Sequence, residues 1–293
     1  MVVEKDRVSH ILLLCCAAIW GGNFVAMKFL LAEISPVNLI LFRFISGSIL
    51  LFLLLFFMED VKVPLRDFYK LCLLGAIGIT VYQFLFIYAL KNTSVTNVVV
   101  IINTAPLYGG LLSSLFGYEK FHKKTFFAIV LGFVGVYILV SKGELLSLGG
   151  EDLKGAVFAL VACFLWALYT IMAKPMLDKH SPLKVTTYSM LTGSLLLCGF
   201  IPFYLDVKEV AALSSLGWLS LIYSIIFSIV IAFFLWYRGV SKIGASRTII
   251  YQYSVPVFGA LSAFLILHER LYWSQLMGAT IIFASITLAK RRQ

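Results

Sequence analysis

The chain has 293 residues, of which 61% are hydrophobic and only 13% are charged, and its mean hydropathy is +0.98. Soluble domains carry about 25% charged and roughly 45–50% apolar residues, so this composition excludes a soluble fold and indicates a membrane protein. The formal net charge of +10 would suggest nucleic acid in a soluble protein. Here the placement of the cations explains it, and we expect no nucleic-acid partner.

Ten apolar runs follow one another along the chain, each near the roughly 20 residues that a membrane-spanning helix needs. The connections are short and leave no room for a folded domain outside the membrane. The first run lacks a small-residue cleavage site, so we expect a span rather than a signal peptide. The predicted fold is an all-α integral membrane protein with ten transmembrane helices, at about residues 9–31, 38–58, 69–90, 96–117, 124–141, 155–174, 184–204, 214–236, 246–267 and 272–289.

The lysines and arginines are unevenly divided between the two sides of the membrane. If the N-terminus is cytoplasmic, most of the 24 fall in cytoplasmic segments, as the positive-inside rule requires. We therefore predict that both termini are cytoplasmic. Arg43 lies within a span, and the cations on the outer side are Lys28, Lys91, Lys142, Lys154, Lys208 and Arg270.

The two halves of the chain resemble each other. At an offset of 146 residues Trp20 aligns with Trp166, and at an offset of 150 Pro106 aligns with Pro256. We predict a first five-helix repeat over residues 1–141, a linker at 142–154 and a second repeat over 155–293. Because five is odd, the repeats must cross the membrane in opposite orientations. Inverted repeats are typical of secondary transporters, whose substrate site lies near the midplane. Further aligned pairs are Lys28 with Lys174, Ser35-Pro36 with Ser181-Pro182, Gly47 with Gly193, Thr96 with Ser246, and Glu119 with Glu269.

Each repeat places a tryptophan near the middle of its first span. Trp20 and Trp166 are each followed eight residues later by a lysine, Lys28 or Lys174, roughly 12 Å further along the same helix face. We interpret the tryptophans as substrate contacts and the lysines as markers of the two cavity mouths. Plain helix packing and snorkelling of the lysines remain alternatives. An aromatic belt at the span ends is expected for Trp218, Trp236 and Trp273.

Two prolines lie near the centres of the fourth and ninth spans. Pro106 and Pro256 each remove a backbone hydrogen bond, so they should kink their helices and leave the carbonyls of Ile102 and Gln252 without a partner. Two kinks at equivalent depth predict bent helices that line a cavity. Polar side chains close to them are Asn103, Thr104, Gln252 and Tyr253.

Arg43 is the deepest strong charge, some five residues into the second span. A charge at such depth is by default a functional candidate, although a structural arginine bonded to helix-end carbonyls or to Glu33 is the alternative. Its counterpart in the second repeat is Ser189, and Gln83 of the third span could line the same cavity or bond a neighbouring helix. All the candidate substrate-binding residues are Trp20, Asn23, Phe24, Arg43, Gln83, Asn103, Trp166, Tyr169, Gln252 and Tyr253.

Other chemistry is not indicated. The five cysteines lack metal-type spacing and the four histidines lie near span ends, so we expect no metal, no cofactor and no disulfide framework. No Ser-His-Asp pattern or phosphate loop is present, and we expect no enzyme. All 14 acidic residues fall outside the spans or at their ends, which argues against a proton relay or a site for lipophilic cations.

Several short motifs occur in a fixed order. They are Trp20 followed by Phe24 and Lys28, Ser35-Pro36 leading to Arg43, PLYGG from Pro106 running on to Tyr118-Glu119, and its copy PVFGA from Pro256 running on to His268-Glu269. Over about residues 9–290 the chain resembles the EamA-type transporters of the drug/metabolite transporter superfamily. The resemblance implies two inverted halves, a cavity between helices one to four and six to nine, and alternating access across the cytoplasmic (inner) membrane of a bacterium or archaeon. Ala167-Leu168 replaces Gly21-Gly22, so the close approach of span one is not expected in span six.

Three functions remain in view. The first is a carrier, mainly for efflux, of small polar or zwitterionic metabolites such as amino acids. The second is a broad exporter of drug-like or aromatic compounds, which the 15% aromatic content favours. The third is a membrane enzyme or scaffold, which would not need kinked midplane helices. The expected partners are a small-molecule substrate and the lipid bilayer, with coupling to a proton or other ion gradient left open.

Overall fold

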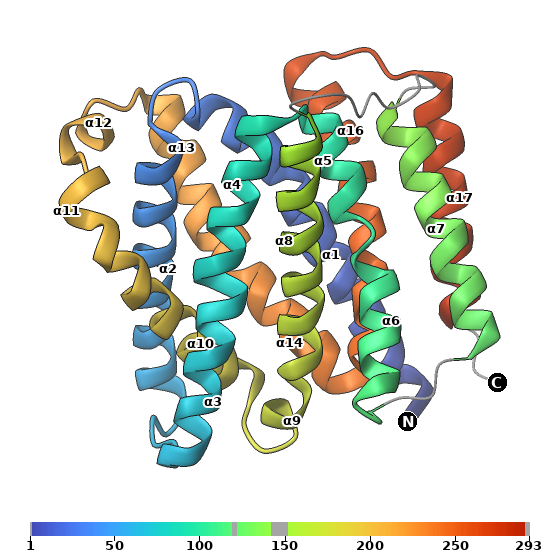
Figure 1. Ribbon diagram of the computed structural model, residues 1–293, viewed down its shortest axis with the longest axis horizontal. Helices are drawn as coiled ribbons and strands as arrows, with labels where there is room; N and C mark the ends of the chain where they lie inside the picture. The colour runs from blue at the N-terminus through green and yellow to red at the C-terminus, as the bar shows by residue number, and fades with distance from the viewer. Residues whose placement is uncertain (1, 119–121, 142–151, 291–293) are drawn as a thin grey trace.

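The computed structural model describes residues 2–118, 122–141 and 152–290, and all regular elements within them are helical (Figure 1). The predicted all-α class is confirmed for this part of the chain. Glu119 and most of the predicted linker 142–154 lie outside the described residues. Nine described stretches are long and apolar enough to cross a membrane: Arg7–Leu30, Pro36–Met58, Leu65–Asn92, Val95–Leu115, Lys123–Ser141, Leu153–Leu177, Pro182–Tyr204, Ser215–Ile243 and Ala245–Leu267.

A tenth apolar helix, Trp273–Ala289, is shorter than these nine, so the number of ten spans stays a prediction. The helices run up and down the molecule, and α1 begins and α17 ends at the edge that is lower in Figure 1. We call this the lower end and the opposite edge the upper end. In the first half of the chain the helices are α1 (Val2–Leu30), α2 (Pro36–Met58), α3 (Leu65–Gly75), α4 (Tyr82–Asn92), α5 (Val95–Ile102), α6 (Ala105–Leu115) and α7 (Lys123–Ser141).

The second half follows a similar order with more short elements. Its helices are α8 (Asp152–Met172), α9 (Lys174–Leu177), α10 (Pro182–Leu197), α11 (Ile201–Tyr204), α12 (Val207–Ala211), α13 (Ser215–Tyr223), α14 (Ala232–Ile243), α15 (Ala245–Ile249), α16 (Ser254–Leu267) and α17 (Trp273–Lys290), with a short 3₁₀ turn η2 (Cys198–Phe200) between α10 and α11.

Two long helical stretches contain a π-helical segment. The first, η1 (Ala76–Val81), joins α3 to α4, and the second, η3 (Ser224–Ile231), joins α13 to α14. A π-turn inserts an extra residue into the helical repeat and so rotates the side chains that follow it. The eighth stretch ends at Ile243 rather than at the predicted residue 236. Residue 236 therefore lies within the helix and not at its end.

The helices that carry the central prolines are irregular. The α5 helix ends at Ile102 and α6 begins at Ala105, so the break directly precedes Pro106. In the equivalent stretch a 3₁₀ turn, η4 (Ile250–Tyr253), precedes α16 and Pro256. Proline cannot donate the hydrogen bond that would continue the preceding helix.

Glycines allow close packing between the two halves. A Cβ atom on Gly21 of α1 would lie 2.6 Å from Cβ of Phe258 in α16, so these helices cross almost backbone to backbone. The α7 and α17 helices lie side by side at one edge of the molecule (Figure 1). A Cβ on Gly278 would lie 2.6 Å from the carbonyl oxygen of Gly135, and a Cβ on Gly135 would lie 2.9 Å from that of Gly278. In lipid there is no hydrophobic effect to drive helices together. Small residues instead let the helix backbones approach closely, and the helices are held by van der Waals packing.

Gly278→Ala should therefore destabilise the protein, because the new methyl group meets the Gly135 backbone. We expect a loss of about 1–3 kcal/mol, as for other overpacked sites, seen as a lower midpoint of thermal unfolding in detergent. Gly199→Ala is the matched control, since a Cβ there would have nothing within 4 Å. Equal midpoints for the two variants would show that α7 and α17 do not pack as described.

Candidate functional site

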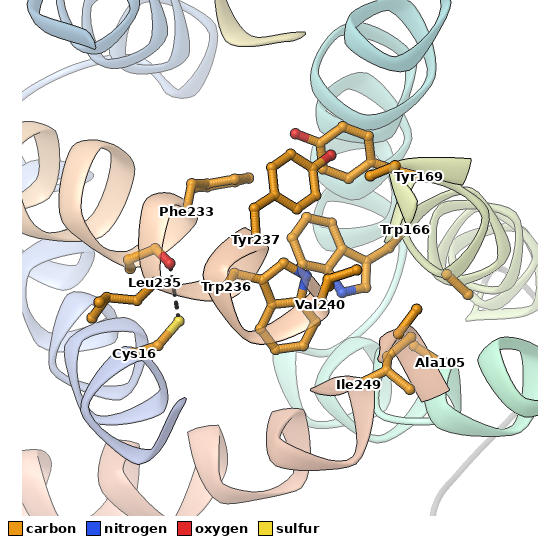
Figure 2. Packing of buried hydrophobic residues seen from close by; sticks show 14 of the residues in the cluster. Cys16, Ala105, Trp166, Tyr169, Phe233, Leu235, Trp236, Tyr237, Val240 and Ile249 are labelled. Atoms are coloured by element: carbon orange, nitrogen blue, oxygen red, sulfur yellow. Dashed lines mark hydrogen bonds between the residues drawn. The ribbon is translucent and has the colours of Figure 1, made fainter. Parts of the chain in front are cut away.

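The middle of the molecule holds a cluster of seven aromatic side chains from four helical stretches. Trp20 of α1 and Trp166 of α8 meet edge to face, with ring centroids 5.7 Å apart and planes at 74°. Trp236 of α14 contacts both rings, at 5.2 and 5.8 Å. Figure 2 shows Trp166, Trp236, Tyr169 and Tyr237 side by side. The central aromatic cluster consists of Trp20, Tyr82, Trp166, Tyr169, Phe233, Trp236 and Tyr237.

Each indole N–H of this cluster has a protein partner. Trp20 donates to the carbonyl oxygen of Ser228 at 3.0 Å, and Trp236 donates to Oγ1 of Thr170 at 3.2 Å. Trp166 is 5% exposed and donates to Oε1 of Gln252 at 2.8 Å. A buried indole needs such a partner, and the bond holds the ring in one orientation. The three rings are thus held in place from separate helices.

Gln252 links this cluster to the broken fourth stretch. Because Pro106 lacks an N–H, the Ile102 carbonyl has no donor within its own helix. Gln252 Nε2 donates to that carbonyl at 3.3 Å, and Cys163 Sγ lies 3.3 Å from the same oxygen. The Ile102 carbonyl is released from its own helix as predicted, but it is bonded by protein groups. The Gln252 carbonyl, for which the same was predicted, accepts from the backbone N–H of Ser254. Gln252 accepts from Trp166 and donates to Ile102, so its amide connects α8 to the break between α5 and α6.

The structure places the other predicted polar residues in different surroundings. Tyr169 is fully buried in the cluster, with its hydroxyl 3.2 Å from Ser189 Oγ. Tyr253 instead points to α7, where its hydroxyl donates to the Ile129 carbonyl at 3.0 Å. Asn103 donates to the Val99 carbonyl at 2.7 Å, and its Oδ1 is buried without a partner among the described residues.

Two predicted residues lie near the cluster without a ring contact to it. Phe24 is 42% exposed and its ring packs on Gly259 of α16. Gln83 is half-buried beside Tyr82 in α4. The structure therefore gathers Trp20, Trp166, Tyr169 and Gln252, and leaves Phe24, Gln83 and Tyr253 outside the cluster.

The expected belt position of Trp236 is wrong. Trp236 is 1% exposed and lies inside the cluster, whereas Trp218 and Trp273 are 42% and 82% exposed. The helix runs seven residues past Trp236, to Ile243, so this tryptophan is not at a span end. A usable signal was present, since apolar residues at i, i+3, i+4 and i+7 mark one buried face: Phe233, Trp236, Tyr237 and Val240.

The upper end is closed by contacts at helix N-termini. Glu33, in the turn after α1, accepts hydrogen bonds from the backbone N–H and the hydroxyl of Ser214, each at 2.7 Å. Ser214 is the N-cap of α13, so the carboxylate also faces the positive end of that helix. Hydrogen bonding, from the Ser214 N–H foremost, lowers the pKa of Glu33 below its usual value. Lys28 forms an ion pair with Glu269 at 2.9 Å, and both side chains are about half exposed.

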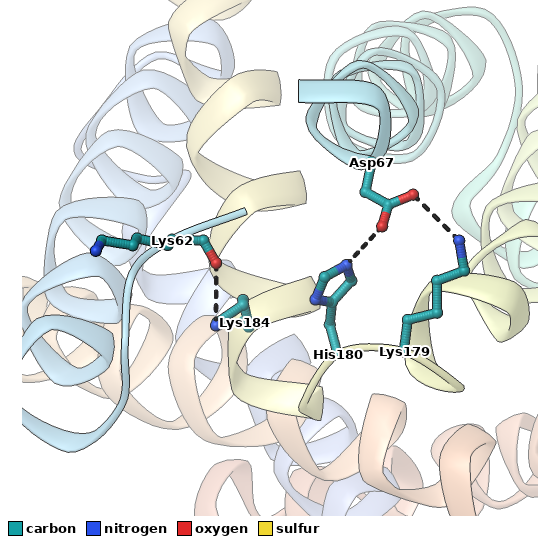
Figure 3. Close-up of polar contacts among 5 residues, drawn as sticks. All are labelled: Lys62, Asp67, Lys179, His180 and Lys184. Atoms are coloured by element: carbon teal, nitrogen blue, oxygen red, sulfur yellow. Dashed lines mark hydrogen bonds and ion pairs between the residues drawn. The ribbon is translucent and has the colours of Figure 1, made fainter. Parts of the chain in front are cut away.

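At the lower end Asp67 of α3 contacts the loop after α9 (Figure 3). One carboxylate oxygen lies 3.0 Å from Nε2 of His180 and the other 3.4 Å from Nζ of Lys179. The ammonium group of Lys184 donates to the Lys62 carbonyl at 3.3 Å. The lysine predicted at this mouth, Lys174, forms an i, i+4 ion pair with Asp178.

The same kind of contact, between a glutamate and the N-cap serine of a helix, occurs at the upper and the lower end of the molecule. Glu209 accepts from the N–H and hydroxyl of Ser35, the N-cap of α2, at 3.0 and 2.9 Å, and from the amide of Asn38 at 2.9 Å. At the lower end Glu59 accepts from the hydroxyl of Ser181, the N-cap of α10. Ser35 and Ser181 are related by the 146-residue offset, and Glu59 and Glu209 by the 150-residue offset. In each case a carboxylate from one half caps a helix of the other.

Arg43 is only 7% exposed, and Asn23 is half-buried with its Oδ1 accepting from Ser224 Oγ at 2.6 Å. The predicted alternative partner of Arg43, Glu33, is occupied by Ser214. Among the described groups, no cluster of three or more His, Cys, Asp or Glu side chains could hold a metal ion.

Comparison with known proteins covers almost the whole chain. Residues 7–141 and 153–290 each match the EamA-like transporter family. An uncharacterized transporter of Archaeoglobus fulgidus is 31% identical over 97% of this chain and 98% of its own length. A probable amino-acid metabolite efflux pump of Escherichia coli is 27% identical over 96% of this chain and 94% of its own. A solved crystal structure with 16% identity has the same fold, with a TM-score of 0.82 over 97% of this chain and 96% of that one.

Gln252→Leu should destabilise the protein, because it leaves the Trp166 N–H without its partner and the Ile102 carbonyl with only the weakly donating Cys163 thiol. Unsatisfied buried groups cost about 1–3 kcal/mol each, so we expect a clearly lower unfolding midpoint and a changed tryptophan emission spectrum. Gln275→Leu, which removes an amide that bonds the exposed N–H of Tyr272, should have a smaller effect. Equal effects would contradict this connecting role of Gln252.

Acid should weaken the upper-end contacts. The pKa of Glu209 is lowered by hydrogen bonds, first from Asn38 and then from Ser35. A carboxyl whose pKa is lower in the folded state stabilises it fully above the unfolded pKa, about 4.3 for Glu. That stability is lost as the pH falls through the folded value. The unfolding midpoint of Glu209→Gln should therefore fall less than that of the wild type between about pH 5 and pH 3. Asp60→Asn, at the lower end, is the control, and parallel curves for wild type and Glu209→Gln would refute the prediction.

Proposed function

The chain belongs to the EamA-like transporter family, and from this premise we propose that it carries small polar or zwitterionic metabolites, with amino acids the leading class, out of the cell. The Escherichia coli relative, named a probable amino-acid metabolite efflux pump, supports this class. The observation that carries the proposal is the central contact between Trp20 and Trp166. Two indoles at mid-depth give the apolar part of a metabolite a surface on which to pack.

Ten spanning helices in two inverted halves are part of the proposal, with α17 as the tenth. Residues 1–141 and 155–293 form the halves and 142–154 the linker. Equivalent contacts support this division. A Cβ on Gly47 would meet Ile229 of η3 at 2.5 Å, and a Cβ on Gly193 would meet Ile79 of η1 at 2.5 Å. Both pairs follow the 146- and 150-residue offsets, so helix two of each half crosses the π-segment of the other.

In this architecture the lower end faces the cytoplasm and the upper end faces the outside. The distribution of lysine and arginine supports this orientation, with both termini cytoplasmic. Lys28 then marks the outer mouth and Lys174 the inner one. The carboxylate contacts of Glu209 and Glu59 lie at these two ends and connect the halves.

Transport then requires the two halves to move about the cluster. Trp20 belongs to the first half and Trp166 to the second, and the bond that Trp20 donates to Ser228 of the second half must break when the halves separate. Rocking of one half against the other would separate the Trp20–Trp166 pair toward one end at a time. A substrate held between the rings would be exposed to each side in turn, as in other carriers built from inverted repeats.

A broad exporter of aromatic or drug-like compounds is the alternative, and the seven rings of the cluster favour it. The two functions differ in the polar group that the substrate must carry. Exchange of radiolabelled amino acids against aromatic dyes in proteoliposomes separates them, and an imposed pH gradient in the same vesicles measures ion coupling.

Trp20→Ala and Trp166→Ala should each reduce counterflow of the most rapidly transported amino acid by about tenfold or more in proteoliposomes. In each variant the substrate loses one stacking surface, which is worth of the order of 1–2 kcal/mol. Trp273→Ala, whose ring is 82% exposed, should transport at the wild-type rate. Helix content and elution from gel filtration should stay unchanged in all three variants. Normal counterflow by a folded Trp166→Ala protein would exclude the cluster from the transport site.

A further inference from the structure

Arg43 lies on a face of α2 that points into the protein. Leu39, Arg43 and Gly47 are spaced four residues apart and therefore share one helix face. Leu39 packs in a buried cluster with Leu30 of α1 and Leu221 of α13. Gly47 lies against Ile229 of η3. Arg43, between them on that face, lies on the side of α2 that packs against η3.

The depth of Arg43 relates it to the aromatic cluster. Trp20 donates to the Ser228 carbonyl, and the next residue, Ile229, is the one that Gly47 contacts. Gly47 is one turn from Arg43, so Arg43 lies about 6 Å further toward the upper end than this level. A molecule with its apolar part on the cluster would extend its other end toward Arg43.

The guanidinium of Arg43 has no counter-charge. Across residues 2–118, 122–141 and 152–290 it makes no ion pair and no hydrogen bond, and its Nε is completely enclosed without a partner. Its Cζ lies over the Phe44 ring, 5.8 Å from the centroid. Among the described acids at the upper end, Glu33 is bonded by Ser214, Glu209 by Ser35 and Asn38, and Glu269 by Lys28. A buried cation without an anion is unfavourable and normally marks a binding site or pathway in a membrane protein.

A second donor contacts η3 from α1. Asn23 lies seven residues before the end of α1, and Arg43 seven residues after the start of α2, so both are about 10 Å from the upper end of their helices. Asn23 Oδ1 accepts from Ser224, the first residue of η3, while its Nδ2 donates to none of the described groups. Carboxylates are bound by just such combinations of guanidinium and amide donors.

The second half offers no equivalent. Ser189, the counterpart of Arg43, is fully buried, and its hydroxyl donates to the Thr186 carbonyl at 3.1 Å and meets Tyr169. The cation is therefore on the upper side of the cluster alone.

We propose that Arg43 of α2, together with Asn23 of α1, binds the carboxylate of the transported compound. This rests on the proposed function and narrows it to anionic or zwitterionic substrates. The carboxylate points to the upper end, and the apolar part packs on the central aromatic cluster. Neutral amides and plain amines of the same shape are poor ligands, because they leave the buried guanidinium unpaired.

The test is ligand-induced thermal stabilisation of the purified protein in phosphatidylcholine nanodiscs, so that no anionic lipid supplies the charge. The probes are the amino acids and, for each, its carboxamide and its decarboxylated amine. We expect at least one amino acid to stabilise the wild type while its amide does not. Arg43→Gln should weaken its binding by about tenfold to a hundredfold, Arg43→Lys should retain part of it, and Lys208→Gln, an exposed cation at the same end, should bind as the wild type does.

Equal stabilisation by acid and amide, or none by any carboxylate, would overturn the proposal, and this comparison needs no variant. Without ligand, Arg43→Gln should unfold no earlier than the wild type, since it removes an unpaired buried charge. A large fall with unchanged ligand shifts would show a structural arginine instead. The proposed function is tested by a different measurement: it is contradicted if no amino acid is exchanged in proteoliposomes. Exchange that is indifferent to the carboxylate would keep the function and reject the Arg43 site.

Discussion

A polar group inside a bilayer has no water to bond, and the described part of the chain meets this constraint by pairing such groups across its two halves. The clearest case is the Ile102 carbonyl, which Pro106 deprives of its helical donor and Gln252 bonds from the other half. The same amide holds Trp166 in place. The break in the helix, the tryptophan and the glutamine therefore depend on one another, and the geometry of the central aromatic cluster follows from their bonds.

The two halves are joined by equivalent contacts at both ends and in the middle. Glycines of helix two lie on an isoleucine of the opposite π-segment, and a glutamate caps the opposite helix two at each end. The π-segments matter here because they set which residues meet at the crossing.

Some positions depart from this equivalence between the halves. Arg43 has Ser189 as its counterpart, so a cation faces one side of the cluster and a neutral, bonded hydroxyl the other. Gly21 of α1 allows a close crossing with α16, whereas Ala167 stands in the equivalent place. In the proposed function, a substrate with a charged end and an apolar end would therefore meet a different surface from each side of the membrane.

The fold class and the general function could be predicted from the sequence alone. Apolar run lengths, the uneven lysines and arginines, and the Trp20 and Trp166 repeat predicted a helical membrane transporter, because lipid constrains length and charge locally. The sequence marks a buried face around Trp236 but could not show that its helix continues to Ile243 and places this ring at the centre. Nor could it show that Gln252 bonds two partners, that Tyr253 turns to α7, or that Glu33 is occupied by Ser214 rather than by Arg43. Those facts depend on which helices cross and at what depth, and only the tertiary structure decides that.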